Sequence, residues 1–262
     1  MRIGCCTGIE NYEALCDLGY DFIELAGMKV MKMSEAELED ARKLIAGRNV
    51  PCNGFNAYCD GALPMAGPEF DLQKARDYAA EICRRGKTLG IRAIGLGAPL
   101  ARRIPKEFDR ATAAGQYRDF ARVTAEECAK HGILLLLEAL SPHVCDVVTQ
   151  TREALEIVKG LDMPNLRMVL DFHHMTRAGE SETDIAYVMP YVKHLHIDET
   201  AENDRYHLKA ESIPFYTRCI AAARACGYDD TIAIEPNASK APFREEAGES
   251  LRILRSILGG SV

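Results

Sequence analysis

Four residues with metal-binding side chains follow apolar runs in the second half of the chain. Each comes after a run rich in Ile, Val and Leu with no other acid, and they are Glu138, Asp171, His196 and Glu235. Oxygen donors with a single imidazole nitrogen suit Mn²⁺ first and Mg²⁺ next, while Zn²⁺ and Co²⁺ remain open. Four protein ligands on an octahedral ion leave two positions for substrate oxygens, such as a carbonyl and a neighbouring hydroxyl. The pattern therefore predicts one divalent metal ion as cofactor.

The alternative for each of these residues is a solvated side chain at the rim of a sheet. A single strand-end glutamate such as Glu138 fits that alternative as well as it fits a ligand. Four such groups brought together would place like charges beside one another, which is costly without a cation. A shared metal ion removes this conflict, and as a Lewis acid it could stabilise an enediolate.

The four residues can meet only if the strands before them are neighbours. The chain alternates strand-like and helix-like segments from end to end. The predicted strands are Arg2–Thr7, Phe22–Leu25, Cys52–Ala57, Ala93–Leu96, Leu134–Glu138, Arg167–Asp171, Val192–His196 and Thr231–Glu235. The predicted helices are Asn11–Leu18, Ser34–Arg48, Asp71–Leu89, Gly115–His131, Thr151–Lys159, Ser181–Tyr187, Pro214–Cys226 and Phe243–Leu258.

This alternation predicts an α/β fold, a single (β/α)8 TIM barrel over residues 1–262. The continuous apolar run Ile133–Leu137 is typical of a strand buried on both faces, as in a parallel sheet covered by helices. Repeated βα units of this number close most simply into a barrel, whose active site lies at the carboxyl ends of the strands. An open doubly wound sheet is the alternative, but the turn at Thr7–Glu10 lacks its glycine-rich phosphate motif.

The composition of the chain disfavours nucleic-acid and membrane partners. The chain carries 32 Lys and Arg against 39 Asp and Glu, a net charge of −7, which disfavours a nucleic-acid partner. No apolar run approaches the ~20 residues that span a bilayer, so we expect no membrane partner. The start of the sequence lacks a signal-peptide pattern, and the ten cysteines contain no CxxC pair. Reduced thiols in a cytoplasmic protein are therefore expected.

The motifs around the four residues resemble those of the sugar phosphate isomerase/epimerase family. This xylose isomerase-like TIM-barrel group includes ketose 3-epimerases, hydroxypyruvate isomerases, dehydratases and AP endonucleases. The resemblance covers the whole chain and is strongest over the last four strands, at Glu138, Val169–His174, His194–Glu199 and Ile234–Pro236. It implies that Glu138 and Glu235 are both metal ligands and acid/base catalysts, acting on a planar enediolate.

The resemblance also implies substrate-binding residues. His174 in the D-x-x-H motif would bind a substrate oxygen, and Arg205 would take the place of the arginine that follows the H-x-H motif, at a longer spacing. Cys6 and Asn56 would line the site from the first and third strands. The family's further glutamate after the fifth strand is absent, and His143 is expected in its place.

The predicted function is a divalent-metal-dependent isomerase or epimerase. Its substrate would be a small sugar, sugar acid or sugar phosphate that loses a proton next to a carbonyl. A dehydratase of a polyol ketone or a dehydroshikimate-like acid remains open, because it needs the same proton abstraction. AP endonuclease activity is disfavoured, because no histidine follows the third or fourth strand. A metal-free sugar-binding relative is disfavoured by the complete ligand set, and a homo-oligomer remains open.

Overall fold

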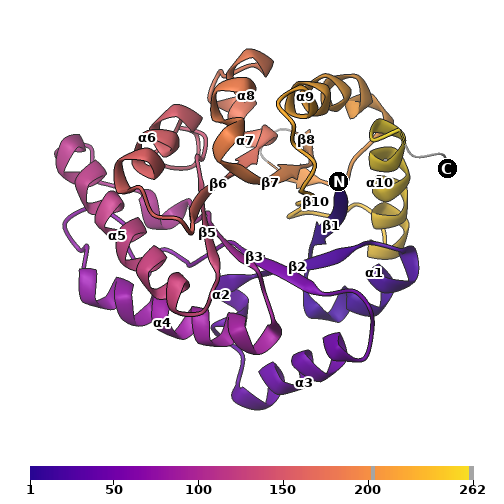
Figure 1. Ribbon diagram of the computed structural model, residues 1–262, viewed down its shortest axis with the longest axis horizontal. Coiled ribbons are helices and arrows are strands. Elements are labelled where there is room, and N and C mark those ends of the chain that lie inside the picture. Colours follow the sequence, from indigo (N-terminus) through magenta and orange to yellow (C-terminus); the bar gives the residue numbers. More distant parts are fainter. Residues whose placement is uncertain (202–203, 260–262) are drawn as a thin grey trace.

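The computed structural model describes residues 1–201 and 204–259. Within these residues eight parallel strands close into a barrel in the order β1-β10-β7-β6-β5-β4-β3-β2, with helices around the outside (Figure 1). The first and last of these strands, β1 and β10, pair with each other and close the ring. The predicted (β/α)8 barrel is confirmed.

The eight barrel strands lie where the sequence predicted them, each bound within one residue. They are β1 (Arg2–Cys6), β2 (Phe22–Ala26), β3 (Cys52–Asn56), β4 (Ala93–Leu96), β5 (Leu134–Glu138), β6 (Leu166–Asp171), β7 (Val192–Ile197) and β10 (Thr231–Ile234). Leu135, Leu136 and Leu137 of β5 are all buried, as the continuous apolar run predicted.

The predicted helices are present with shifted ends. They are α1 (Tyr12–Leu18), α3 (Glu35–Ala46), α4 (Leu72–Leu89), α5 (Arg110–Lys130), α6 (Thr151–Leu161), α8 (Glu182–Val188), α9 (Ile213–Ala225) and α10 (Phe243–Ile257). The predicted start of α5 at Gly115 is wrong. Asp109 caps the helix earlier, because its Oδ2 accepts a hydrogen bond of 2.7 Å from the Thr112 amide.

Two short α-helices and a β-hairpin follow barrel strands directly. The short helices α2 (Gly27–Val30) and α7 (Phe172–Arg177) begin directly after β2 and β6. An antiparallel hairpin of β8 (Glu199–Ala201) and β9 (Asp204–Tyr206) extends beyond β7. These elements lie at the carboxyl ends of the strands, so they add to the face on which barrel active sites are found.

The ten cysteines form no disulfide with one another. All ten are free, and most are buried. Cys83 and Cys128 meet between α4 and α5 at an Sγ–Sγ distance of 3.5 Å, a thiol hydrogen bond and not a disulfide.

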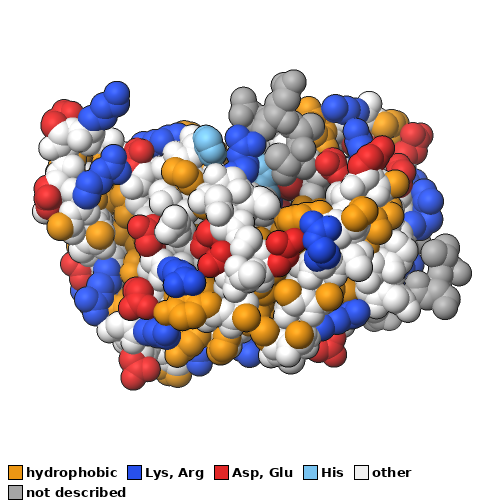
Figure 2. Space-filling view, turned by 90° about the horizontal axis from the view of Figure 1, so that it is seen from above, with side chains coloured by type: hydrophobic (Ala, Val, Ile, Leu, Met, Phe, Trp, Pro, Cys, Tyr) orange, Lys and Arg blue, Asp and Glu red, His pale blue; other side chains and the backbone are white. Residues whose placement is uncertain are grey.

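The outer surface carries both signs of charge. On the face shown in Figure 2, acidic and basic side chains are interspersed, and neither gathers into a broad patch. Among the described residues, no helix combines the length and the hydrophobicity that crossing a bilayer requires.

The carboxyl ends of β4 and β5 are tied together by Arg102, whose side chain is fully buried. Its Nη1 donates a hydrogen bond of 2.8 Å to the Glu138 carbonyl, and its Nη2 donates to the Leu96 carbonyl. The guanidinium also lies 4.7 Å from the centre of the Tyr117 ring. This arginine therefore fixes the backbone from which the Glu138 side chain extends.

Arg102→Met is expected to lower the free energy of unfolding by about 3 kcal/mol, because two buried carbonyls lose a charged donor. Urea denaturation would measure the change. The neighbouring Arg103→Met is the control: Arg103 is exposed and pairs with Asp146 at 3.3 Å, so its loss should cost less than about 1 kcal/mol. Equal losses in the two variants would contradict the role given to Arg102.

Candidate active site and metal centre

The four predicted ligands converge at one end of the barrel. Glu138 ends β5, Asp171 ends β6, His196 lies near the end of β7, and Glu235 directly follows β10. These strands are neighbours in the barrel, and in the β6–β7 register Asp171 lies beside His196. One ligand atom from each of the four side chains lies within 4.8 Å of the others.

The donor set fits a divalent cation. His196 Nδ1 lies 3.1 Å from Glu235 Oε2 and 3.9 Å from Glu138 Oε1. Ligand bonds of about 2.0–2.2 Å place two atoms of one coordination shell roughly 3–4.4 Å apart. His196 Nδ1 and Glu235 Oε2 are buried, and neither makes a hydrogen bond among the described residues. Two buried polar atoms that face each other in this way are suited to a shared ion.

The charged side chains of the cluster shift the pKa values of their neighbours. Burial raises the pKa of Glu138, and the charges of Glu235 and Asp171 add to the rise. Burial also opposes ionisation of Glu235, but the charges of Arg205 and His196 outweigh it and lower the pKa of Glu235 to about 2. The predicted crowding of like charges is therefore present, and positive charge relieves it.

The two carboxylate oxygens of Asp171 face different partners. Its Oδ1 caps α7, accepting hydrogen bonds from the amides of His173 at 2.8 Å and His174 at 3.3 Å. Its Oδ2 lies 2.6 Å from Arg205 Nη2, among the other ligand atoms. The helix start thus fixes the carboxylate plane and leaves one oxygen for the site.

His174 faces the cavity in a neutral form. Burial lowers the pKa of its imidazole to about 4. The Ser141 amide lies 3.4 Å from Nδ1, which accepts its hydrogen bond. The remaining nitrogen, Nε2, then carries the proton. His174 can therefore donate a hydrogen bond to a substrate oxygen, in line with the role expected of it.

Arg205 reaches the cluster from β9. Its Nη2 lies 2.6 Å from Asp171 Oδ2 and 2.8 Å from Glu235 Oε2, and its Nε contacts Asp198. Asp198 also lies 3.2 Å from His173 Nδ1. Sequence reasoning did not single out Asp198, although an acid two residues after His196 was a usable signal.

A cavity of about 550 Å³ opens above the cluster. Its lining includes six residues that the sequence predicted to bind metal or substrate, and they come from different elements: Cys6, Asn56, Glu138, His174, Arg205 and Glu235. Asn56 also acts on a ligand directly, because its Nδ2 donates a hydrogen bond of 2.5 Å to Glu235 Oε1.

His143 is not brought to the site. It is exposed, its carbonyl accepts a hydrogen bond of 2.6 Å from Arg103, and it is absent from the cavity lining. The turn after β5 carries it outward, so the structure does not support the substrate-binding role predicted for it.

Gly97, directly after β4, makes room for the Glu138 carboxylate. A Cβ atom at this position would lie 1.9 Å from Glu138 Oε2, far inside van der Waals contact. Any side chain there would displace the carboxylate away from the other ligands. The position needs glycine for space, since its backbone is not in the left-handed region.

Gly97→Ala is expected to lower kcat/KM at least about 100-fold and to weaken divalent-ion binding, because the methyl group displaces Glu138. Steady-state kinetics and titration with Mn²⁺ would measure both. Gly115→Ala is the matched control, because a Cβ there meets no atom within 4 Å on helix α5. Unchanged Mn²⁺ affinity in Gly97→Ala would contradict this account.

The comparisons with known proteins agree with the observed fold. The family model described as xylose isomerase-like TIM barrel matches residues 12–257. The chain belongs to this family. The resemblance drawn from the motifs is thereby confirmed.

Two relatives that match over most of the chain are sugar epimerases. It is 24% identical over 259 residues to D-psicose 3-epimerase of Ruminiclostridium cellulolyticum, covering 95% of this chain and 84% of that protein. It is 28% identical over 257 residues to ketose 3-epimerase of Arthrobacter globiformis, covering 90% of this chain and 83% of that one. A crystal structure of D-psicose 3-epimerase in the presence of D-fructose matches with a TM-score of 0.85 and 21% identity, over 99% of this chain and 100% of that one. These relatives are enzymes, which confirms that prediction for this member of the family.

Proposed function

We propose that the protein is a divalent-metal-dependent epimerase or isomerase of a small sugar, sugar acid or sugar phosphate. The observation that carries the proposal is the pair Glu138 and Glu235, which approach His196 Nδ1 from strands on either side of it, at 3.9 and 3.1 Å. A pair of carboxylates can remove a proton on one face of a planar intermediate and return one on the other. The names of the relatives support this class of reaction.

Separate roles in metal binding and proton transfer are assigned to the residues of the site. Glu138, Asp171, His196 and Glu235 would hold the ion, Mn²⁺ in the first place, with Mg²⁺, Zn²⁺ and Co²⁺ as alternatives. When bound, the ion would polarise the substrate carbonyl and offset the negative charge that develops on its oxygen. Glu138 and Glu235 exchange protons with the carbon next to that carbonyl.

Neighbouring side chains would orient the substrate. His174 donates a hydrogen bond to a substrate oxygen through its Nε2, and Arg205 supplies a positive charge beside Asp171 and Glu235. Asn56 donates a hydrogen bond to Glu235, and Cys6 also lines the cavity. A cavity of about 550 Å³ lies in the range that accepts a single small ligand, so a monosaccharide fits.

Deuterium exchange tests the proposal. Ketoses, sugar acids and their phosphates would be incubated in D₂O with the Mn²⁺-loaded protein, and NMR would detect deuterium on the carbon next to the carbonyl. An epimer or isomer carrying deuterium is the expected product. A dehydrated product would support the dehydratase alternative, because loss of a hydroxyl can follow the same proton abstraction. No exchange with any of these compounds would contradict the proposal.

A further inference from the structure

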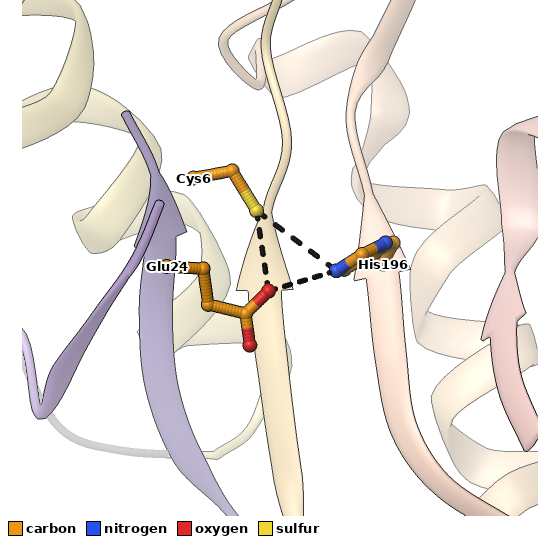
Figure 3. A group of neighbouring side chains, drawn as sticks. All are labelled: Cys6, Glu24 and His196. Carbon is orange, nitrogen blue, oxygen red and sulfur yellow. Dashed lines mark hydrogen bonds and ion pairs between the residues drawn. The ribbon is translucent and has the colours of Figure 1, made fainter. Parts of the chain in front are cut away.

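Beneath the proposed metal site, Glu24 of β2 is buried in the barrel interior. Its side chain is 6% exposed, and its Oε2 lies 3.1 Å from Nε2 of His196, the nitrogen that points away from the other ligands. Figure 3 shows this carboxylate oxygen directed at both the imidazole and the Cys6 thiol. Glu24 has no role in the proposed metal binding by the four ligands, in proton transfer or in substrate binding.

The two nitrogens of His196 face different partners. Nδ1 faces Glu138 and Glu235, whereas Nε2 faces Glu24. A neutral imidazole carries one N–H and one lone pair, and an ionised carboxylate can only accept hydrogen bonds. With Glu24 as acceptor, the proton is held on Nε2 and the lone pair of Nδ1 is directed at the cluster. This is the tautomer that a ligand through Nδ1 requires.

Glu24 is itself held in place. Its second oxygen, Oε1, lies 3.1 Å from His194 Nε2, and His194 Nδ1 lies 2.8 Å from Thr231 Oγ1 on β10. The Cys6 thiol donates to Oε2 at 3.5 Å. His194 and His196 share one face of β7 because they are two residues apart, and their rings meet edge to face at 4.6 Å. Oε2 thus takes part in hydrogen bonds with His196 and Cys6 while Oε1 lies beside His194, and these contacts favour the orientation of Glu24 toward His196.

We propose that Glu24 is a positioning residue of the metal centre: by accepting a hydrogen bond from His196 Nε2, it fixes the tautomer and the orientation in which His196 binds the ion. The inference rests on the proposed metal-dependent function. It adds a residue from β2, on the far side of the barrel from β5 and β6, to the determinants of metal affinity.

A second arrangement of the same atoms is a second metal site. Cys6 Sγ, Glu24 Oε2 and His196 Nε2 lie 3.1 to 3.9 Å apart, and thiolate, carboxylate and imidazole suit Zn²⁺. That site would require His196 to lose its Nε2 proton while Nδ1 binds the first ion. We favour the hydrogen-bonded arrangement because one carboxylate accepts from the thiol and the imidazole together, and the number of ions bound decides between the two.

The test is the affinity of the purified protein for Mn²⁺, measured by titration calorimetry or EPR without substrate. Glu24→Leu is expected to weaken Mn²⁺ binding by about 10–100-fold, because His196 loses its acceptor. Glu24→Gln retains an oxygen that can accept from Nε2–H, so it should recover a large part of that loss. The matched control is Glu127→Gln, which alters a buried carboxylate on α5 that pairs with Arg76 and Lys130; its Mn²⁺ affinity should stay within about twofold of the parent protein.

Unchanged Mn²⁺ affinity in folded Glu24→Leu would overturn the proposal, and so would binding of two ions per chain. If Glu24→Leu does not fold, NMR of the Zn²⁺-loaded parent protein decides: a proton on His196 Nε2 supports the proposal, and a proton on Nδ1 overturns it. These readouts need no substrate. Failure of the exchange assay with intact Mn²⁺ binding would count against the proposed reaction alone, whereas an active enzyme with an insensitive Glu24 would count against this inference alone.

Discussion

Replacing either Glu138 or Glu235 by glutamine should abolish proton exchange at the substrate carbon, with a fall in rate of at least about 10³-fold. An amide cannot take up the proton, and it is a weaker ligand for a divalent ion. Each side chain lies within 4 Å of His196 Nδ1, so each variant removes an acid from the cluster itself. The rate of deuterium incorporation in D₂O at saturating Mn²⁺ measures the effect.

The two variants must be separated from simple loss of the ion. Mn²⁺ bound per chain is therefore measured in the same samples, and only the rate of ion-loaded protein is compared. Glu127→Gln again serves as control, since it removes a carboxylate on helix α5 that pairs with Arg76 and Lys130 and not with the ligand cluster, and it should leave exchange within about twofold. A parent-like exchange rate in either Glu138→Gln or Glu235→Gln would contradict the acid/base role assigned to that residue.

The barrel and the meeting of the four ligands were predictable because they depend only on two features of the sequence. These are the periodicity of apolar residues and the order of strands and helices along the chain. Apolar runs of strand length alternate with amphipathic helices, and in a parallel barrel every strand delivers its last residue to the same end. Glu138, Asp171, His196 and Glu235 therefore meet wherever the strands begin, and an error of one residue at a strand end does not separate them.

The contacts around the ligands were less predictable because they depend on loops and side-chain direction. Arg205 reaches Asp171 and Glu235 from a hairpin that strand and helix periodicity did not reveal. His143 was placed at the site by its distance from Glu138 along the chain, but the turn after β5 points it outward. Glu24 lies on a correctly predicted strand, and only the three-dimensional structure shows its carboxylate between two histidines.

Removing the divalent ion with a chelator should reduce the exchange rate by at least about 10³-fold, and added Mn²⁺ should restore it. An ion present at 100 times its dissociation constant stabilises the folded protein by about 2.7 kcal/mol. Chelation should therefore lower the Tm by about 5–10 °C in a chain of this length. Calorimetric scans with and without chelator measure the shift, and a protein that keeps both activity and Tm under chelation would refute metal dependence.

Arg205 should determine how much stability the protein loses when the ion is removed. Without the ion, its guanidinium remains the positive charge facing Asp171 and Glu235, at 2.6 and 2.8 Å. Arg205→Met removes the largest positive charge that compensates these buried acids once the ion is absent, so chelation should cost this variant about 2 kcal/mol more than the parent protein. Linkage then requires the variant to bind Mn²⁺ more tightly, because the ion no longer competes with the guanidinium for the same oxygens. Arg218→Met, which removes an exposed arginine paired with Glu182, should show the parent shift, and equal shifts in all three proteins would mean that Arg205 and the ion do not share these ligands.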